Sequence, residues 1–90
     1  MIHRGVAQKY VQEMAWPAGQ TIPRVLLGCN DAGQWMVRLH EPILAGWADR
    51  AIVVGTTPEG ALQGALERWL EVKGLNNHPL LYVQIRRLTN

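Results

Sequence analysis

The side chains that could act as nucleophiles, general bases or metal ligands are few and widely spaced in this chain. The single cysteine, Cys29, and the three histidines, His3, His40 and His78, form no closely spaced pair. Metal sites need clustered ligands, so the sequence predicts no metal site. Cys29 and His40 together would offer a nucleophile and a base, but a free cysteine at the end of a strand is usually a small buried hydrophobic residue.

The carboxylates and glycines form no catalytic pattern either. Asp31, Glu41 and Asp49 fall in expected turns, where aspartate caps backbone groups and glutamate is solvated. The glycines are spread singly, without the cluster that cradles a phosphate or a dinucleotide. We therefore predict that the chain is not an enzyme and binds no cofactor, and we rank a small enzyme subunit last among the functions considered.

Length, composition and charge bound the remaining functions. The chain has 90 residues, of which 48% are hydrophobic and 18% charged. This length suits one compact domain, which buries roughly 60–65% of its unfolded surface. So apolar a composition predicts that some apolar surface faces a partner. The net charge is only +2, which is a weak signal for nucleic acid.

The same features predict where the chain resides. One cysteine cannot form an internal disulfide, and the first residues lack the charged-then-apolar pattern of a signal peptide. No apolar run approaches the roughly 20 residues that cross a bilayer. We expect a cytoplasmic protein that does not enter the membrane.

Hydrophobic periodicity predicts the elements that position these side chains. Residues 6–16 place apolar side chains at spacings of three and four, as an amphipathic helix requires, and Pro17 ends it. Two short strands at 24–29 and 34–40, joined by a turn, predict a hairpin. The β-branched run within 50–55 predicts a third strand, buried on both faces.

The second helix carries the clearest signals for its two ends. Thr56 and Glu59 have capping-box spacing, Thr57 is an alternative N-cap, and Pro58 suits the first helical position. Gly74 supplies the left-handed residue that commonly ends a helix. The apolar stripe between these ends, which we expect to pack on the sheet, consists of Leu62, Ala65, Leu66, Trp69 and Leu70.

A fourth strand is predicted after this helix, because apolar and more polar side chains alternate over residues 81–86. The element order becomes α-β-β-β-α-β. It predicts an α+β fold with a mainly antiparallel four-stranded sheet, one packed helix and an N-terminal helix. We expect residues 1–90 to form a single domain, with an N-terminal helical segment at 1–20 and a sheet-plus-helix core at 21–90.

Two stretches in the middle of the chain resemble a known family. The loop Pro42-Ile43-Leu44-Ala45-Gly46-Trp47 follows a strand, and Gly55-Thr56-Thr57-Pro58-Glu59-Gly60-Ala61-Leu62 leads into a helix. This order resembles the HicB antitoxin family, in which a Pro-x-Leu-x-Gly-Cys loop precedes a Gly-Asp-Thr-x-Glu-Glu-Ala helix start. The resemblance covers about residues 30–74. It implies a non-catalytic protein that masks a small RNA-cleaving toxin by direct contact.

The chain departs from that family pattern at several points. Trp47 stands where the family usually has cysteine, and Gly60 replaces the second acidic residue. The spacing from loop to helix is several residues longer, and no helix-turn-helix or ribbon-helix-helix segment follows.

Exposed apolar and aromatic residues are the candidates for binding a partner. Tryptophan is enriched at interface hot spots, and Trp47 lies in a loop beside Ile43 and Leu44, while Trp16 and Tyr10 belong to the first helix. Either indole could instead fold over the sheet and close the core, so the sequence leaves both interpretations open. The predicted function is a protein-binding inhibitor of the antitoxin or phage type, whose partner is a toxin or a host defence or regulatory protein. Exposed strand edges also favour a homodimer.

Nucleic-acid binding is the alternative. A helix, three strands and a helix is also the element order of a double-stranded RNA-binding domain, and arginines on one face would contact phosphates. Against this, the second helix starts with Glu59 rather than with a basic cluster. The arginines that would have to gather are Arg24, Arg38, Arg50, Arg86 and Arg87.

Overall fold

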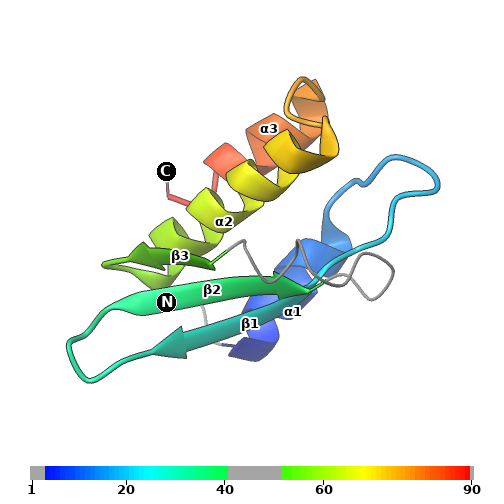
Figure 1. The fold of residues 1–90 in the computed structure, drawn as a ribbon. Coiled ribbons are helices and arrows are strands. Elements are labelled where there is room, and N and C mark those ends of the chain that lie inside the picture. Colours follow the sequence, from blue (N-terminus) through cyan, green and yellow to red (C-terminus); the bar gives the residue numbers. More distant parts are fainter. Residues whose placement is uncertain (1–3, 41–51, 90) are drawn as a thin grey trace.

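The fold contains three helices and one three-stranded antiparallel sheet (Figure 1). The structure is a computed structural model that describes residues 4–40 and 52–89. Along the chain, the elements are α1 (Arg4–Glu13), β1 (Arg24–Cys29), β2 (Trp35–His40), β3 (Ile52–Gly55), α2 (Pro58–Lys73) and α3 (Pro79–Arg86). The order is therefore α-β-β-β-α-α.

The predicted four-stranded sheet is wrong, because the last segment is a helix and not a strand. Pro79 occupies the first turn of α3, and the Nδ1 atom of His78 accepts a hydrogen bond from the Leu81 N–H at 3.4 Å. Leu81 and Ile85 are both fully buried, whereas Val83 between them is 44% exposed. Positions four apart share a face in a helix and in a strand alike, so the apolar pair at 81 and 85 fits both periods.

The three strands form a simple meander in the order β1-β2-β3. The predicted hairpin is confirmed: Leu27 pairs with Val37, and Val37 pairs with Val53 of the third strand. β3 is also confirmed as a strand, but the prediction that it is buried on both faces is wrong. Ile52 and Val54 are 51% and 53% exposed.

α2 begins at the alternative N-cap, Thr57, and not at Thr56, and it ends at Gly74 as predicted. The Thr57 side chain accepts a hydrogen bond from the Gly60 N–H at 3.1 Å, Pro58 follows at the first helical position, and Gly74 closes the helix with φ 71°. Its buried residues are Pro58, Ala61, Leu62, Ala65, Leu66, Trp69 and Leu70. The predicted stripe is therefore buried as expected.

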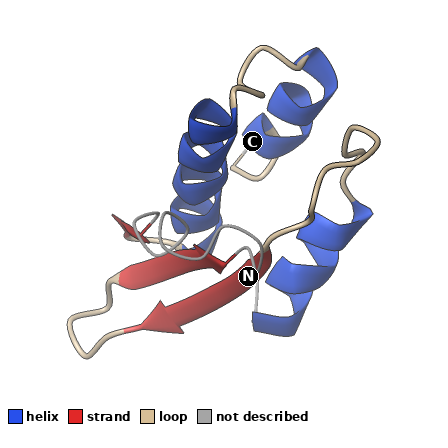
Figure 2. Cartoon of the chain, turned by 45° about the vertical axis from the view of Figure 1, so that its right-hand side comes forward, coloured by secondary structure: helices blue, strands red, loops and turns tan. Residues whose placement is uncertain are grey.

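One face of the sheet is covered by helices. α1 packs on β1, while α2 packs on β2 and β3, and α3 lies against α2 (Figure 2). Val25, Leu27, Val37 and Leu39 point into this layer and share one buried cluster with both long helices. We call this side the inner face of the sheet. Its opposite side is the outer face.

Three alanine substitutions test the helical assignment of α3. Leu81→Ala and Ile85→Ala should each lower the free energy of unfolding by about 2–4 kcal/mol, because each removes a fully buried side chain. Val83→Ala should change it by less than about 0.5 kcal/mol, since Val83 lies on the exposed side. Urea titrations followed by circular dichroism measure all three, and an equal cost at the three positions would indicate a strand.

Candidate functional site

The outer face of the sheet is assembled from alternate residues of all three strands. Strand register places them in transverse rows, so that Leu26 lies beside Arg38 and Arg38 beside Ile52. The next row on this face lies two residues further along each strand and consists of Gly28, Met36 and Val54. Among the described residues, the outer-face positions are Arg24, Leu26, Gly28, Met36, Arg38, His40, Ile52 and Val54.

Large apolar side chains dominate this face. Leu26 and Ile52 are each 51% exposed, Met36 is 41% exposed and Val54 is 53% exposed. The solvent side of an antiparallel sheet normally carries polar side chains. Four aliphatic side chains on adjoining positions therefore form an exposed apolar patch of the kind that marks interaction sites.

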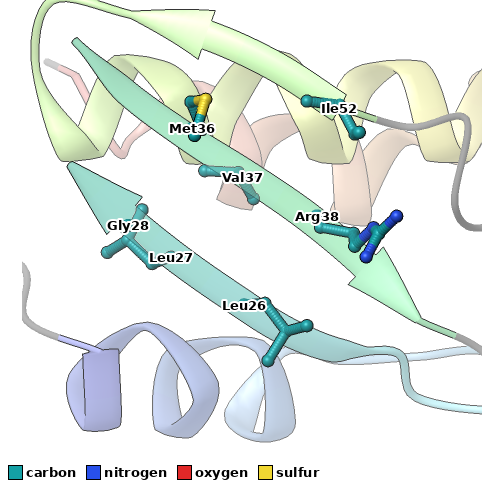
Figure 3. Close-up of a pocket in the computed structure, with 7 residues that line it drawn as sticks. All are labelled: Leu26, Leu27, Gly28, Met36, Val37, Arg38 and Ile52. Carbon is teal, nitrogen blue, oxygen red and sulfur yellow. The ribbon is translucent and has the colours of Figure 1, made fainter. Parts of the chain in front are cut away.

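A shallow hollow lies at the centre of the patch (Figure 3). Gly28 contributes no side chain, and a Cβ atom placed there would meet nothing within 4 Å. The hollow has a volume of about 540 Å³ and its rim includes Leu26, Met36, Arg38 and Ile52. The missing side chain thus turns a flat sheet surface into a recess that can receive an apolar group.

The ionisable side chains at the described outer-face positions are all basic. Within residues 4–40 and 52–89, they are Arg24, Arg38 and His40, and no carboxylate lies among the outer-face positions. Arg24 and His40 pair across β1 and β2 at one end of the hairpin. The patch combines aliphatic contact area with a basic margin, which favours an acidic complement.

Two of the predicted partner-binding residues, Trp16 and Tyr10, make contacts within the chain. The Trp16 Nε1–H donates to the Val11 carbonyl at 2.7 Å, and its ring meets the Trp69 ring edge-on at 5.2 Å between centroids. The Tyr10 hydroxyl donates to the Gln84 carbonyl, which joins α1 to α3. Both side chains are half-buried. They hold the helical layer together, and the structure places neither on the outer face.

The remaining candidates are divided among different parts of the chain. Ile43, Leu44, Trp47 and Arg50 lie outside the described residues. Within the described ones, the arginines do not gather. Arg24 and Arg38 are on the outer face, whereas Arg86 and Arg87 are at the end of α3 on the helical side.

The prediction that Arg86 belongs to a strand is wrong, because its segment is helical. Arg86 Nη1 bonds to Glu67 Oε1 at 3.2 Å, and its guanidinium lies over the Tyr82 ring. The pairing joins α3 to α2 at the surface. Arg86 therefore belongs to a local ion pair between helices.

The structure separates the residues whose chemistry might have combined. Cys29 is exposed at one end of the β1-β2 hairpin and His40 lies at the other, roughly 17 Å away along the strands. Among residues 4–40 and 52–89, no three histidine, cysteine or acidic side chains are close enough to hold a metal ion. Over the same ranges, no helix has the length and apolar character needed to cross a bilayer.

Comparison of the chain with protein-family models, curated proteins and solved structures found no match. The candidate site therefore depends on the geometry of the chain itself. Sequence patterns missed the outer face because the apolar run in β3 was predicted to be buried on both faces. The signal that could have found it is Met36 and Arg38, whose alternation in β2 already defined a face opposite to Val37.

A tyrosine substitution tests the contact between α1 and α3. Burial raises the pKa of Tyr10 above its usual value of 10.0, and the charge of Arg87 partly opposes this shift. The folded state therefore holds the phenol proton more tightly than the unfolded state. The stability that follows is complete below pH 10 and is lost as the pH rises through the folded pKa.

Tyr10→Phe should lower the free energy of unfolding by about 1 kcal/mol at neutral pH, because it removes the hydrogen bond to Gln84. It should also flatten the decline of stability above pH 10. Tyr82→Phe is the matched control, since Tyr82 is 48% exposed on α3. Chemical denaturation across a pH series measures both effects, and identical behaviour of the two variants would contradict the role of Tyr10.

Proposed function

We propose that this chain is a small non-enzymatic module that binds a protein partner through the outer face of its sheet. The observation that carries the proposal is the set of four half-exposed aliphatic side chains on adjoining positions, Leu26, Met36, Ile52 and Val54. Exposing them to water is unfavourable, at about 25 cal/mol for each Å² of apolar surface. A partner that covers them gains that free energy on binding.

The chemistry of the face defines the partner class. Aliphatic side chains surround a recess above Gly28, and basic groups border it. The complementary surface is apolar with an acidic margin, as on an amphipathic helix or a loop that carries aspartate or glutamate. Such binding would cover a functional surface of the partner, and an inhibitor of the antitoxin or phage type would act in this way.

The local likeness to HicB antitoxins supports the proposal through one of its two stretches. The start of α2 combines Thr57, Glu59 and Ala61 in the family order, and Ala61 packs against Gly55 at the end of β3. Capping and close packing account for these residues in any small α+β protein. The outer face therefore carries more of the argument than the likeness does.

Nucleic-acid binding is the second candidate, favoured by one observation. An α-β-β-β-α order with both helices on the same face of the sheet is the arrangement of double-stranded RNA-binding domains. However, Arg86 and Arg87 lie at the C-terminal end of α3, on the helical side of the sheet and away from Arg24 and Arg38. Glu59 also stands in the first turn of α2. The described outer face also offers no tryptophan, tyrosine or phenylalanine on which bases would stack, and its one aromatic ring is the His40 imidazole at the end of the hairpin.

A charge placed in the patch should abolish partner binding. We expect Leu26→Glu to weaken capture of the partner by about tenfold or more, because it removes apolar contact and buries an acidic group. Leu80→Glu is the matched control, since Leu80 is 50% exposed but lies on α3. Tagged chain and both variants are incubated with native lysate, and captured proteins are quantified by mass spectrometry.

The proposal requires one protein that co-purifies in a fixed ratio with the wild type and Leu80→Glu but not with Leu26→Glu. Loss with both variants or with neither would contradict it. Retention on RNA at physiological salt that Arg86→Glu/Arg87→Glu removes would favour the nucleic-acid candidate instead, since phosphate contacts weaken steeply with salt.

A further inference from the structure

The two edges of the sheet differ in how their backbone groups are satisfied. At β1, the side chain of Gln8 from α1 lies against the edge. Its Oε1 accepts from the Val25 N–H at 2.7 Å, and its Nε2 donates to the Pro23 carbonyl at 3.3 Å. The amide of Gln8 thus makes the two bonds that a neighbouring strand would make, which shields this part of the edge.

The bond to Gln8 also fixes which residues of β3 face outward. Because the Val25 N–H points away from β2, the opposed pair Val25 and Leu39 is not hydrogen-bonded between β1 and β2. The odd-numbered residues of β2 therefore direct their backbone groups toward β3, and Val37 exchanges its bonds with Val53. The N–H and C=O groups of Ile52 and Val54 then point away from β2, toward the outer edge of the sheet.

Within the described residues, the β3 edge lacks the protections that strand edges usually carry. Its sequence, Ile52–Gly55, contains no proline and no charged residue. In residues 4–40 and 52–89, no side chain bonds to the edge of β3 as Gln8 does at β1. An edge of this kind is a template for a further strand.

We propose that the occupant of this edge is a second copy of the chain, paired antiparallel through β3 about a twofold axis at Val53. Ile52 then lies opposite Val54 of the partner subunit, and the pair exchanges both of its backbone hydrogen bonds. The symmetry repeats this for Val54. Two three-stranded sheets become one continuous sheet, and their outer faces become one surface.

The proposed β3–β3 pairing brings no like charges into contact. Ile52 and Val54 are aliphatic in both copies, so the row Leu26, Arg38, Ile52 continues into apolar residues of the second copy. The two Arg38 residues are separated by three strand spacings, roughly 15 Å or more, which exceeds the Debye length at physiological salt.

Oligomeric state tests this inference. Multi-angle light scattering across a concentration series should give twice the mass of the 10.1 kDa chain. Ile52→Lys should raise the dissociation constant of the dimer by about tenfold or more, since it places a charge on the pairing edge. Leu26→Lys is the matched control because Leu26 has the same 51% exposure in the same row but lies on β1, and it should leave the dimer intact.

Disulfide trapping tests the register. In a Cys29→Ser background, a mixture of the Ile52→Cys and Val54→Cys chains should form a cross-linked dimer under mild oxidation, because opposed residues lie within disulfide reach. Either chain alone should cross-link far less, since its own cysteines are diagonal neighbours. Wild type that stays monomeric at every concentration, or equal cross-linking in all three samples, would overturn the proposal.

The two proposals fail separately. If both Leu26→Lys and Ile52→Lys lose partner capture but only Ile52→Lys loses the dimer, the result supports both the proposed function and the proposed dimer. A partner lost in both variants with no dimer in the wild type leaves the proposed function and removes the dimer. An unrelated strand on this edge, seen as an edge cross-link to another protein without any homodimer, also overturns the inference.

Discussion

The packing of α2 against the inner face of the sheet is the interaction on which the rest of the structure depends. The helix approaches so closely that a Cβ atom on Gly55 would lie 3.0 Å from the Ala61 backbone nitrogen, and one on Gly64 would lie 3.1 Å from Val53. Glycine at both points removes the atoms that would separate helix and strand. A helix this close to β3 buries its whole apolar stripe and covers the inner face of β2 and β3.

The other two helices pack around α2 on the same side of the sheet. Trp69, fully buried on α2, meets Trp16 after the end of α1, and Lys73 lies over its ring at 5.5 Å. α3 buries Leu81 and Ile85 in the same cluster, and Tyr10 joins it to α1. Because all three helices lie on the inner side or against α2, none covers the outer face. Two layers of this size leave one sheet surface to water or to a partner.

The sequence was most informative where a local rule acts alone. The bounds of β1 and the two ends of α2 could be predicted because a turn, an N-cap and a left-handed glycine each act within a few residues. α3 could not, because Leu81 and Ile85 satisfy both a strand and a helix period and only tertiary burial separates them. The exposed apolar patch on the outer face could not be predicted for the same reason. Ile52, Val53 and Val54 are equally aliphatic, and nothing local says which of them the core receives.

The error in the last segment changes the interpretation of the sheet itself. A fourth strand would have occupied an edge, and the chain would have had less backbone to offer a partner. With residues 79–86 folded as α3, β3 remains an edge strand whose outward side chains and outward backbone groups belong to the same two residues, Ile52 and Val54. Side chains that point from the face and backbone groups that point along the sheet do not compete for the same partner atoms. The proposed pairing at the edge of β3 would therefore leave the outer face open, and the dimer would present two copies of the patch on one continuous surface.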